Sequence, residues 1–222
     1  MIHYDKTSQA LAVGLAAVAG YVDALGYLHF GGYFASFMSG NSTRLALGLT
    51  SDRDVAMKAG ALIGLFVAGV MLGAVAGQVA GRRRAPVVLG IVVLLLLAAA
   101  GLARIGQPYA AVPMVLAMGA ENAVFQRNGD VSIGLTYMTG TLVKFGQRLA
   151  AALTGQGDRL GWLPYGLLWC GLVSGSITGG LAYRAVQLQG LWAAAGAMGC
   201  LLVVAALLPR RAKAAIAPAA KA

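Results

Sequence analysis

Charged residues are scarce in this sequence, and so are the patterns that mark catalytic or metal-binding sites. Only 11% of the 222 residues are charged, whereas a soluble domain is nearer a quarter. The two cysteines, Cys170 and Cys200, lie in apolar runs without a CxxC or Cys/His pattern, which excludes a disulfide framework or a cysteine metal site. No HExxH, GxSxG or P-loop sequence is present. We therefore predict a protein that is not an enzyme and has no cofactor or metal.

Long apolar runs dominate instead. The stretches from Val87 to Ala103 and from Leu191 to Leu208 contain no charged residue, and a run of about 18 to 20 apolar residues spans a bilayer. The net charge of +10 comes from basic residues between such runs. There they orient a chain in the membrane and contact lipid head groups, so we do not expect nucleic acid as a partner. The N-terminus lacks a basic n-region, which favours a retained first helix over a signal peptide.

Six segments are predicted to be helices that cross the membrane, and two more are ambiguous. The six are Ser8 to Leu28, Val55 to Val79, Pro86 to Arg104, Tyr109 to Phe125, Trp162 to Arg184 and Leu188 to Leu208. The ambiguous segments are Tyr33 to Leu49 and Leu135 to Leu153, which are apolar but interrupted by Gly, Ser, Thr and basic residues.

Three sequence features recur in the same order after about 100 residues. GYVDA at Gly20 matches GAENA at Gly119, and FMSGN at Phe37 matches YMTGT at Tyr137. Gly69, Gly73 and Gly77 match Gly171, Gly175 and Gly179. A fixed period of this kind indicates an internal repeat. We expect a first membrane repeat over 1–105, a second over 106–209 and a basic cytoplasmic tail over 210–222, all within one membrane domain.

The distribution of positive charge favours one topology. If the two motif segments do not cross the membrane, twelve Lys and Arg residues fall on one side and five on the other. If they do cross, the Arg82–Arg84 run falls on the poorer side, against the positive-inside rule. The sequence thus predicts an all-α polytopic membrane protein with about six transmembrane helices. They form two inverted three-helix repeats, each with a short broken or re-entrant motif segment, and both termini are in the cytoplasm. Inverted repeats with broken segments are typical of transporters.

The two glycine stripes are interpreted as helix-packing surfaces. Gly69, Gly73 and Gly77 share one helical face, as do Gly171, Gly175 and Gly179. Small residues four apart allow two helix backbones to approach closely in lipid. A dimer interface is the alternative.

Two carboxyl groups, Asp23 and Glu121, lie inside predicted spans. A carboxylate at the bilayer centre costs on the order of 2.5 to 3.5 kcal/mol. These side chains should therefore face a polar cavity or a partner. One interpretation is a proton- or cation-coupling site. The other is a structural lock, in which a carboxylate caps a break in the facing motif. For Glu121, an ion pair with Arg127 is a further alternative.

The two motif segments are predicted to carry the substrate or ion pathway. Helix can unwind where Gly adjoins Ser or Thr, and the freed backbone groups must then line a cavity or be buried. A half-helix starting near Asn41, and another after Gly140, would point positive N-termini at a polar or anionic solute. The alternative is a pair of amphipathic helices on the membrane surface. The candidate residues are Ser39, Gly40, Asn41, Thr139, Gly140 and Thr141, together with Asp23, Glu121 and Asn122.

The stretch GYVDALGYLHFGGYFASFMSGN, with the later GAENAVF and TYMTGT, resembles the YoaK-like family of bacterial multi-pass inner-membrane proteins, a family of unknown function numbered 1275. The resemblance covers nearly the whole chain and implies a six-span protein of the bacterial inner membrane. Asp23, Met38, Gly40 and Asn41 match the first block of the family, and Asn122, Met138, Thr139 and Gly140 match the second. Typical members have Gln where this chain has Glu121.

The sequence leads to two functional hypotheses. The first is a small-solute transporter or channel, expected to be a homodimer, with its polar site where the two motif breaks meet. The second is a non-transporting assembly or partner-binding protein, in which the motif segments are structural struts.

Overall fold

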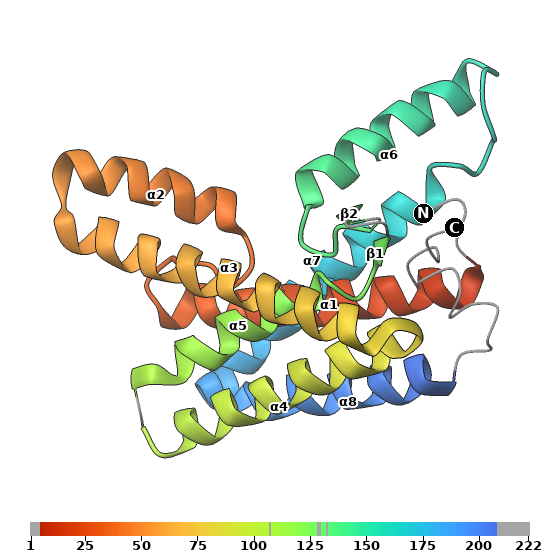
Figure 1. Ribbon diagram of the computed structural model, residues 1–222. Helices are drawn as coiled ribbons and strands as arrows, with labels where there is room; N and C mark the ends of the chain where they lie inside the picture. Colours follow the sequence, from red (N-terminus) through yellow and green to blue (C-terminus); the bar gives the residue numbers. More distant parts are fainter. Residues whose placement is uncertain (1–4, 107, 128–129, 132, 208–222) are drawn as a thin grey trace.

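The computed structural model describes residues 5–106, 108–127, 130–131 and 133–207 (Figure 1). The regular structure of the described chain is helical, as the sequence predicted, apart from one hairpin of two strands with two residues each. The α-helices are α1 Lys6–His29, α2 Met38–Ser51, α3 Arg53–Ala80, α4 Arg84–Arg104, α5 Ala111–Glu121, α6 Met138–Leu153, α7 Leu163–Val186 and α8 Leu191–Leu207. Short 3-10 turns lie at Gly81–Arg83, Pro108–Ala110 and Gln187–Gly190. The strands β1 Gln126–Arg127 and β2 Asp130–Val131 pair antiparallel. The predicted tail 210–222 lies outside the described residues.

Three continuous helical stretches are long and apolar enough to cross a membrane, judged by length and composition. They are Lys6–His29, Arg53–Arg104 and Leu163–Leu207. The second contains α3 and α4, and the third contains α7 and α8. Each pair reverses direction at a tight turn that contains a residue of positive φ, Gly81 at 52° and Gln187 at 50°. This arrangement supports the predicted membrane class.

The sixth predicted span is shorter than expected. Helix α5 begins at Ala111 and ends at Glu121, whereas the apolar pattern predicted a helix to Phe125. At 1.5 Å per residue its 11 residues reach only about 17 Å, well short of a bilayer core of about 30 Å. Residues 122–125 continue it as turns, because Ala123 and Val124 donate backbone hydrogen bonds three residues back rather than four.

The two ambiguous segments form the short helices α2 and α6. Their 14 and 16 residues correspond to about 21 and 24 Å, so neither spans a bilayer alone. Helix α2 packs antiparallel against the first half of α3, and Asp52 between them caps α3 by accepting hydrogen bonds from the backbone N–H of Asp54 (2.9 Å) and Val55 (3.4 Å). Helix α6 contacts α7 and projects from the body of the molecule (Figure 1).

The prediction of where the motif helices begin was wrong. The helices start at Met38 and Met138, so the Ser/Thr-Gly pairs lie in the first helical turn rather than at a break. In the first half the chain turns earlier, at Gly31 and Gly32, whose φ angles are 69° and 91°. Glycine adopts such angles without the steric cost that other residues meet. The irregular backbone therefore precedes each motif.

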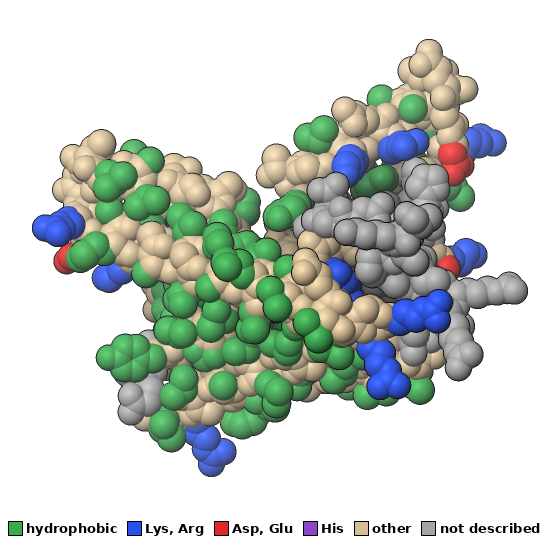
Figure 2. Space-filling view, in the orientation of Figure 1, with side chains coloured by type: hydrophobic (Ala, Val, Ile, Leu, Met, Phe, Trp, Pro, Cys, Tyr) green, Lys and Arg blue, Asp and Glu red, His purple; other side chains and the backbone are tan. Residues whose placement is uncertain are grey.

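The core lies where α1, α3, α4, α5, α7 and α8 meet. Helix α1 packs along α7, α3 packs along α5, and α4 packs along α8. Fully buried side chains include Leu15, Leu89, Met118 and Phe125. Figure 2 shows apolar side chains spread over the outer faces of α3 and α4, with basic side chains gathered near the helix ends. Met71 and Leu94 are 63% and 67% exposed, which suits surfaces that face lipid.

Candidate functional site

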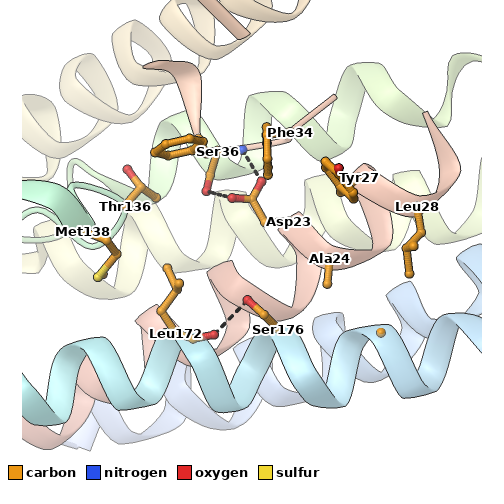
Figure 3. A pocket seen from close by; sticks show the side chains of 12 residues that line it. Asp23, Ala24, Tyr27, Leu28, Phe34, Ser36, Thr136, Met138, Leu172 and Ser176 are labelled. Carbon is orange, nitrogen blue, oxygen red and sulfur yellow. Dashed lines mark hydrogen bonds between the residues drawn. The ribbon is translucent and has the colours of Figure 1, made fainter. Parts of the chain in front are cut away.

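A pocket of about 520 Å³ lies where the two motif segments approach α1 and α7 (Figure 3). Four parts of the chain line this pocket: the second half of α1, residues 34–37, residues 136–138 and the middle of α7. Segments that are about 100 residues apart in the sequence thus share one wall. The lining residues are Asp23, Ala24, Tyr27, Leu28, Phe34, Ser36, Phe37, Thr136, Met138, Leu172, Ser176 and Gly180.

Asp23 is the charged residue of this lining and is held by Ser36. Its Oδ1 accepts a hydrogen bond from the Ser36 backbone N–H (2.6 Å), and its Oδ2 accepts one from the Ser36 hydroxyl (2.7 Å). The carboxylate of α1 thereby fixes the irregular backbone just before α2. These are the contacts expected of the structural lock, formed at the edge of a pocket.

The second half of the chain makes a corresponding contact without a charge. The Thr136 hydroxyl donates to the side-chain oxygen of Asn122 (3.1 Å), and the Asn122 amide donates to the Met118 carbonyl (3.0 Å). Asn122 occupies the position of Asp23 in the aligned GAENA and GYVDA motifs. In both halves, the polar residue that follows the recurring Gly–x–x spacing holds a hydroxyl residue that precedes the motif helix.

Glu121 lies beside this contact and has no hydrogen-bond partner among the described residues. Its side chain is 0% exposed, and both carboxyl oxygens are buried and unpaired. It is the last residue of α5, which contacts α1, the helix that carries Asp23. The side chain of Arg127 lies outside the described residues, so the alternative ion pair stays a prediction.

Asn41 has a different role from the helix cap that its residue type predicted. Its side-chain oxygen accepts from the Phe34 backbone N–H (3.0 Å), and its amide donates to the Phe34 carbonyl (2.8 Å). Because Asn41 already lies inside α2, it reaches back and closes the loop before the helix. Arg44, one turn later, stacks over the ring of Tyr33 with 4.7 Å between the guanidinium carbon and the ring centroid.

Most of the predicted pathway residues lie away from the pocket. Of the nine candidates only Asp23 is in its lining; Glu121 and Asn122 are buried next to it. The others are not lining residues: Ser39, Thr139 and Gly140 are exposed or nearly so, Gly40 faces the Phe34 and Phe37 rings, and Asn41 and Thr141 are buried. The polar residues that sequence reasoning missed are Ser36, Thr136 and Ser176. Ser36 and Thr136 also recur about 100 residues apart, a signal that the motif search could have included.

The glycine stripes lie where helix backbones approach. A Cβ built on Gly73 would meet Ala120 of α5, and one on Gly69 would overlap the Leu116 carbonyl. In α7, added Cβ atoms at Gly171, Gly175 and Gly179 would meet the backbone of α1 at Val13, Ala17 and Tyr21. Gly77 faces the side chain of Arg84 instead.

Arg84 is a buried cation that sequence reasoning placed at the membrane surface. It is 4% exposed and donates to the side-chain oxygen of Gln126 (2.6 Å) and to the Ala123 carbonyl (3.5 Å). Its partners belong to the turn after α5, so it ties the start of α4 to that turn. Within the described part of the chain, no group of three or more His, Cys, Asp or Glu residues could hold a metal ion.

Comparisons with known proteins agree with this picture. The profile of the family described as Protein of unknown function (DUF1275) matches residues 11–207. The UPF0700 transmembrane protein RA0705 of Rhizobium meliloti (strain 1021) is 36% identical over 203 residues, which cover 91% of this chain and 88% of the relative. No solved structure matches the chain significantly. The resemblance to the YoaK-like family is thus confirmed, and the chain belongs to the DUF1275 family of transmembrane proteins of unknown function.

Proposed function

We propose that the two halves of the chain are inverted repeats. The packing supports this: α1 lies along α7 as α5 lies along α3, and α2 lies on α3 as α6 lies on α7. The contacts also correct the sequence alignment. Gly69 meets Leu116, the equivalent of Ala17, and Ala17 meets Gly175 rather than Gly171. Gly69 therefore corresponds to Gly175, one helical turn beyond the predicted pairing, and Gly81 then corresponds to Gln187 at the matching turn.

The same arrangement supports an orientation with both ends of the described chain in the cytoplasm of a bacterial cell. In Figure 1 the start of α1 at Lys6, the turn between α3 and α4 at Arg82–Arg84, and the end of α8 lie at one end of the molecule. Concentrated Arg and Lys residues favour the cytoplasmic side. The membrane would be the inner membrane.

We propose further that the protein is a transporter or channel for a small solute that passes through the pocket beside Asp23. The observation that carries this proposal is the meeting of both motif segments in one pocket with a carboxylate and three Ser or Thr hydroxyl groups. Irregular backbone inside a membrane protein is tolerated where it lines a cavity or is buried in protein. Transporter sites are typically formed by such broken segments.

Of the predicted polar and anionic solutes, the lining favours a neutral polar solute over an anion, and it also suits a cation. Asp23 places negative charge in the pocket, and its bond to the Ser36 N–H occupies a donor that an anion would need. The remaining lining is mainly apolar, with aromatic rings from Tyr27, Phe34 and Phe37. A homodimer stays a prediction.

The strut hypothesis has its own support, because Asp23 and Ser36 form a closed hydrogen-bonded lock. A flux assay separates the two hypotheses. Proteoliposomes would be exposed to gradients of glycerol, erythritol or methylammonium chloride, and their volume followed by light scattering. We expect the wild type to accelerate entry of at least one probe.

Two variants locate the path. Ala24→Phe places a ring in the pocket, whereas Leu94→Phe enlarges a side chain that is 67% exposed on α4. We expect Ala24→Phe to reduce flux at least fivefold and Leu94→Phe to leave it unchanged. Folded wild type that passes no probe would favour the strut, whereas equal flux in the two variants would refute a path through this pocket.

A further inference from the structure

Glu121 is a buried carboxyl group for which the protein provides no neutralising partner among the described residues. Its side chain is 0% exposed, and neither oxygen accepts a hydrogen bond there. An ionised carboxylate in such surroundings is very costly, whereas the neutral acid is not. A group of this kind is expected to carry a proton or to bind a cation.

Among the side chains that the structure describes, Asp23 of α1 and Arg84 of α4 are charged groups on elements that contact α5. Helix α1, which contacts α5, carries the Asp23 carboxyl group. From α4, the Arg84 guanidinium is engaged by Gln126 and the Ala123 carbonyl. Helix α3 has no ionisable side chain between Lys58 and its last residue, Ala80. Glu121 therefore has a second carboxyl group as its charged neighbour.

The two carboxyl groups differ in their hydrogen bonds. Asp23 accepts two hydrogen bonds from Ser36, which stabilise an ionised carboxylate. Glu121 accepts none. Asp23 also lines the pocket, whereas Glu121 lies behind it, next to the Asn122–Thr136 contact whose Thr136 lines the same pocket. Asp23 is thus the carboxyl group that lines the pocket, and Glu121 is a buried acid outside its lining.

We propose that Asp23 and Glu121 form a site for one proton, held by Glu121 and exchanged with the pocket by way of Asp23. The inference rests on the proposed function in that the proton would be the coupling ion of transport. Proton exchange breaks the O–H bond of one carboxylic acid and forms that of the other, and the negative charge moves in the opposite direction. When Asp23 carries the proton, its hold on Ser36 weakens, which loosens the backbone before α2.

A metal cation fits this site less well. Calcium takes six to eight oxygen ligands, and magnesium demands a near-octahedral set. The described residues supply two carboxyl groups here and no larger cluster of His, Cys, Asp or Glu. Two carboxyl groups are sufficient to share a proton, as in the paired carboxylates of acid proteases.

The test is infrared difference spectroscopy of the full-length protein in lipid nanodiscs during a pH change. We expect the C=O band of a protonated carboxylic acid to disappear as the pH rises. Glu121→Gln, which keeps the side-chain shape, should remove this band. Asp23→Asn should keep the band but change the pH at which it disappears. The control Asp158→Asn, at an exposed carboxylate, should change neither.

Thermal stability gives a second readout. Raising the pH should lower the melting temperature of the wild type, because it ionises a buried and unpaired acid, and the melting temperature of Glu121→Gln should depend less on pH. A band that persists in Glu121→Gln, or a response to sodium rather than to pH, would overturn the proposal. If flux does not change with a pH gradient, coupling to protons is refuted but the transport proposal stands. If Glu121 titrates but no probe is transported, the transport proposal is refuted and the proton site stands.

Discussion

Replacing Gly175 by Ala tests whether backbone contact between α1 and α7 holds the fold together. A Cβ at this position would lie 2.7 Å from the carbonyl carbon and 2.9 Å from the Cα of Ala17. Ordinary contact begins near 3.4 Å, so the two helices must separate by roughly 1 Å, and a gap of that size forfeits a quarter to a half of each dispersion contact. Overpacking typically costs about 1 to 3 kcal/mol.

We expect a loss of about 3 kcal/mol in the free energy of unfolding for Gly175→Ala. This loss lies at the upper end of the usual range for overpacking, because the atoms that obstruct the new Cβ belong to the backbone of Ala17, which cannot rotate away as a side chain can. In lipid, moreover, helix association depends on close packing rather than on the hydrophobic effect. Such a loss corresponds to about a hundredfold change in the unfolding equilibrium constant. The measurement is reversible unfolding in mixed detergent micelles.

The matched control is Gly180→Ala in the same helix. A Cβ there meets nothing within 4 Å, so we expect a change of less than about 0.5 kcal/mol, as for a substitution away from tight packing. If both variants unfold like the wild type, the α1–α7 interface is looser than the structure describes and the packing role proposed for the glycine stripes is refuted.

Two further substitutions test the loops and caps around the site. Asn41→Leu leaves the Phe34 backbone N–H and carbonyl without their side-chain partner, so unfolding in micelles should show a loss of about 2 to 4 kcal/mol; a loss no larger than that of the exposed control Thr43→Val would contradict the loop-closing role. Asp52→Ala removes the cap of α3 and should cost about 1 kcal/mol, measured in the same way; a stability equal to that of wild type would show that water replaces the cap.

The sequence predicted the long helices well because each is a nearly uninterrupted apolar run bounded by charges or breakers. It predicted the start of the motif helices poorly. Gly40 and Gly140 suggested a break, but a glycine in the first turn of a helix is tolerated, whereas the positive φ angles at Gly31 and Gly32 are what redirect the chain. Local propensity could not decide which of these glycines the tertiary structure uses.

The site was predicted in part for a related reason. Asp23 and Glu121 were identified because charge is costly at bilayer depth, and that rule needs no knowledge of the fold. Ser36 and Thr136 are small polar residues without a distinctive motif of their own, and only the partners that the fold brings to them give them a role. Arg84 was missed because a basic run at a helix end is ordinarily solvated, whereas here Gln126 reaches it from another element.

The comparison of the two proposed repeats separates the requirements of the fold from those of the chemistry. Each half has a side-chain oxygen on α1 or α5 that accepts a hydrogen bond from a hydroxyl before the motif helix, and Asn122 shows that an amide is sufficient. Asp23→Asn keeps one acceptor oxygen for Ser36, and its NH2 group can donate to the Ser36 hydroxyl in place of the second bond. The charge of Asp23 is then not needed for the architecture. If Asp23→Asn folds but has lost flux, the charge of Asp23 is needed for function. A variant that removes both the charge and the hydrogen bond could not separate the two effects.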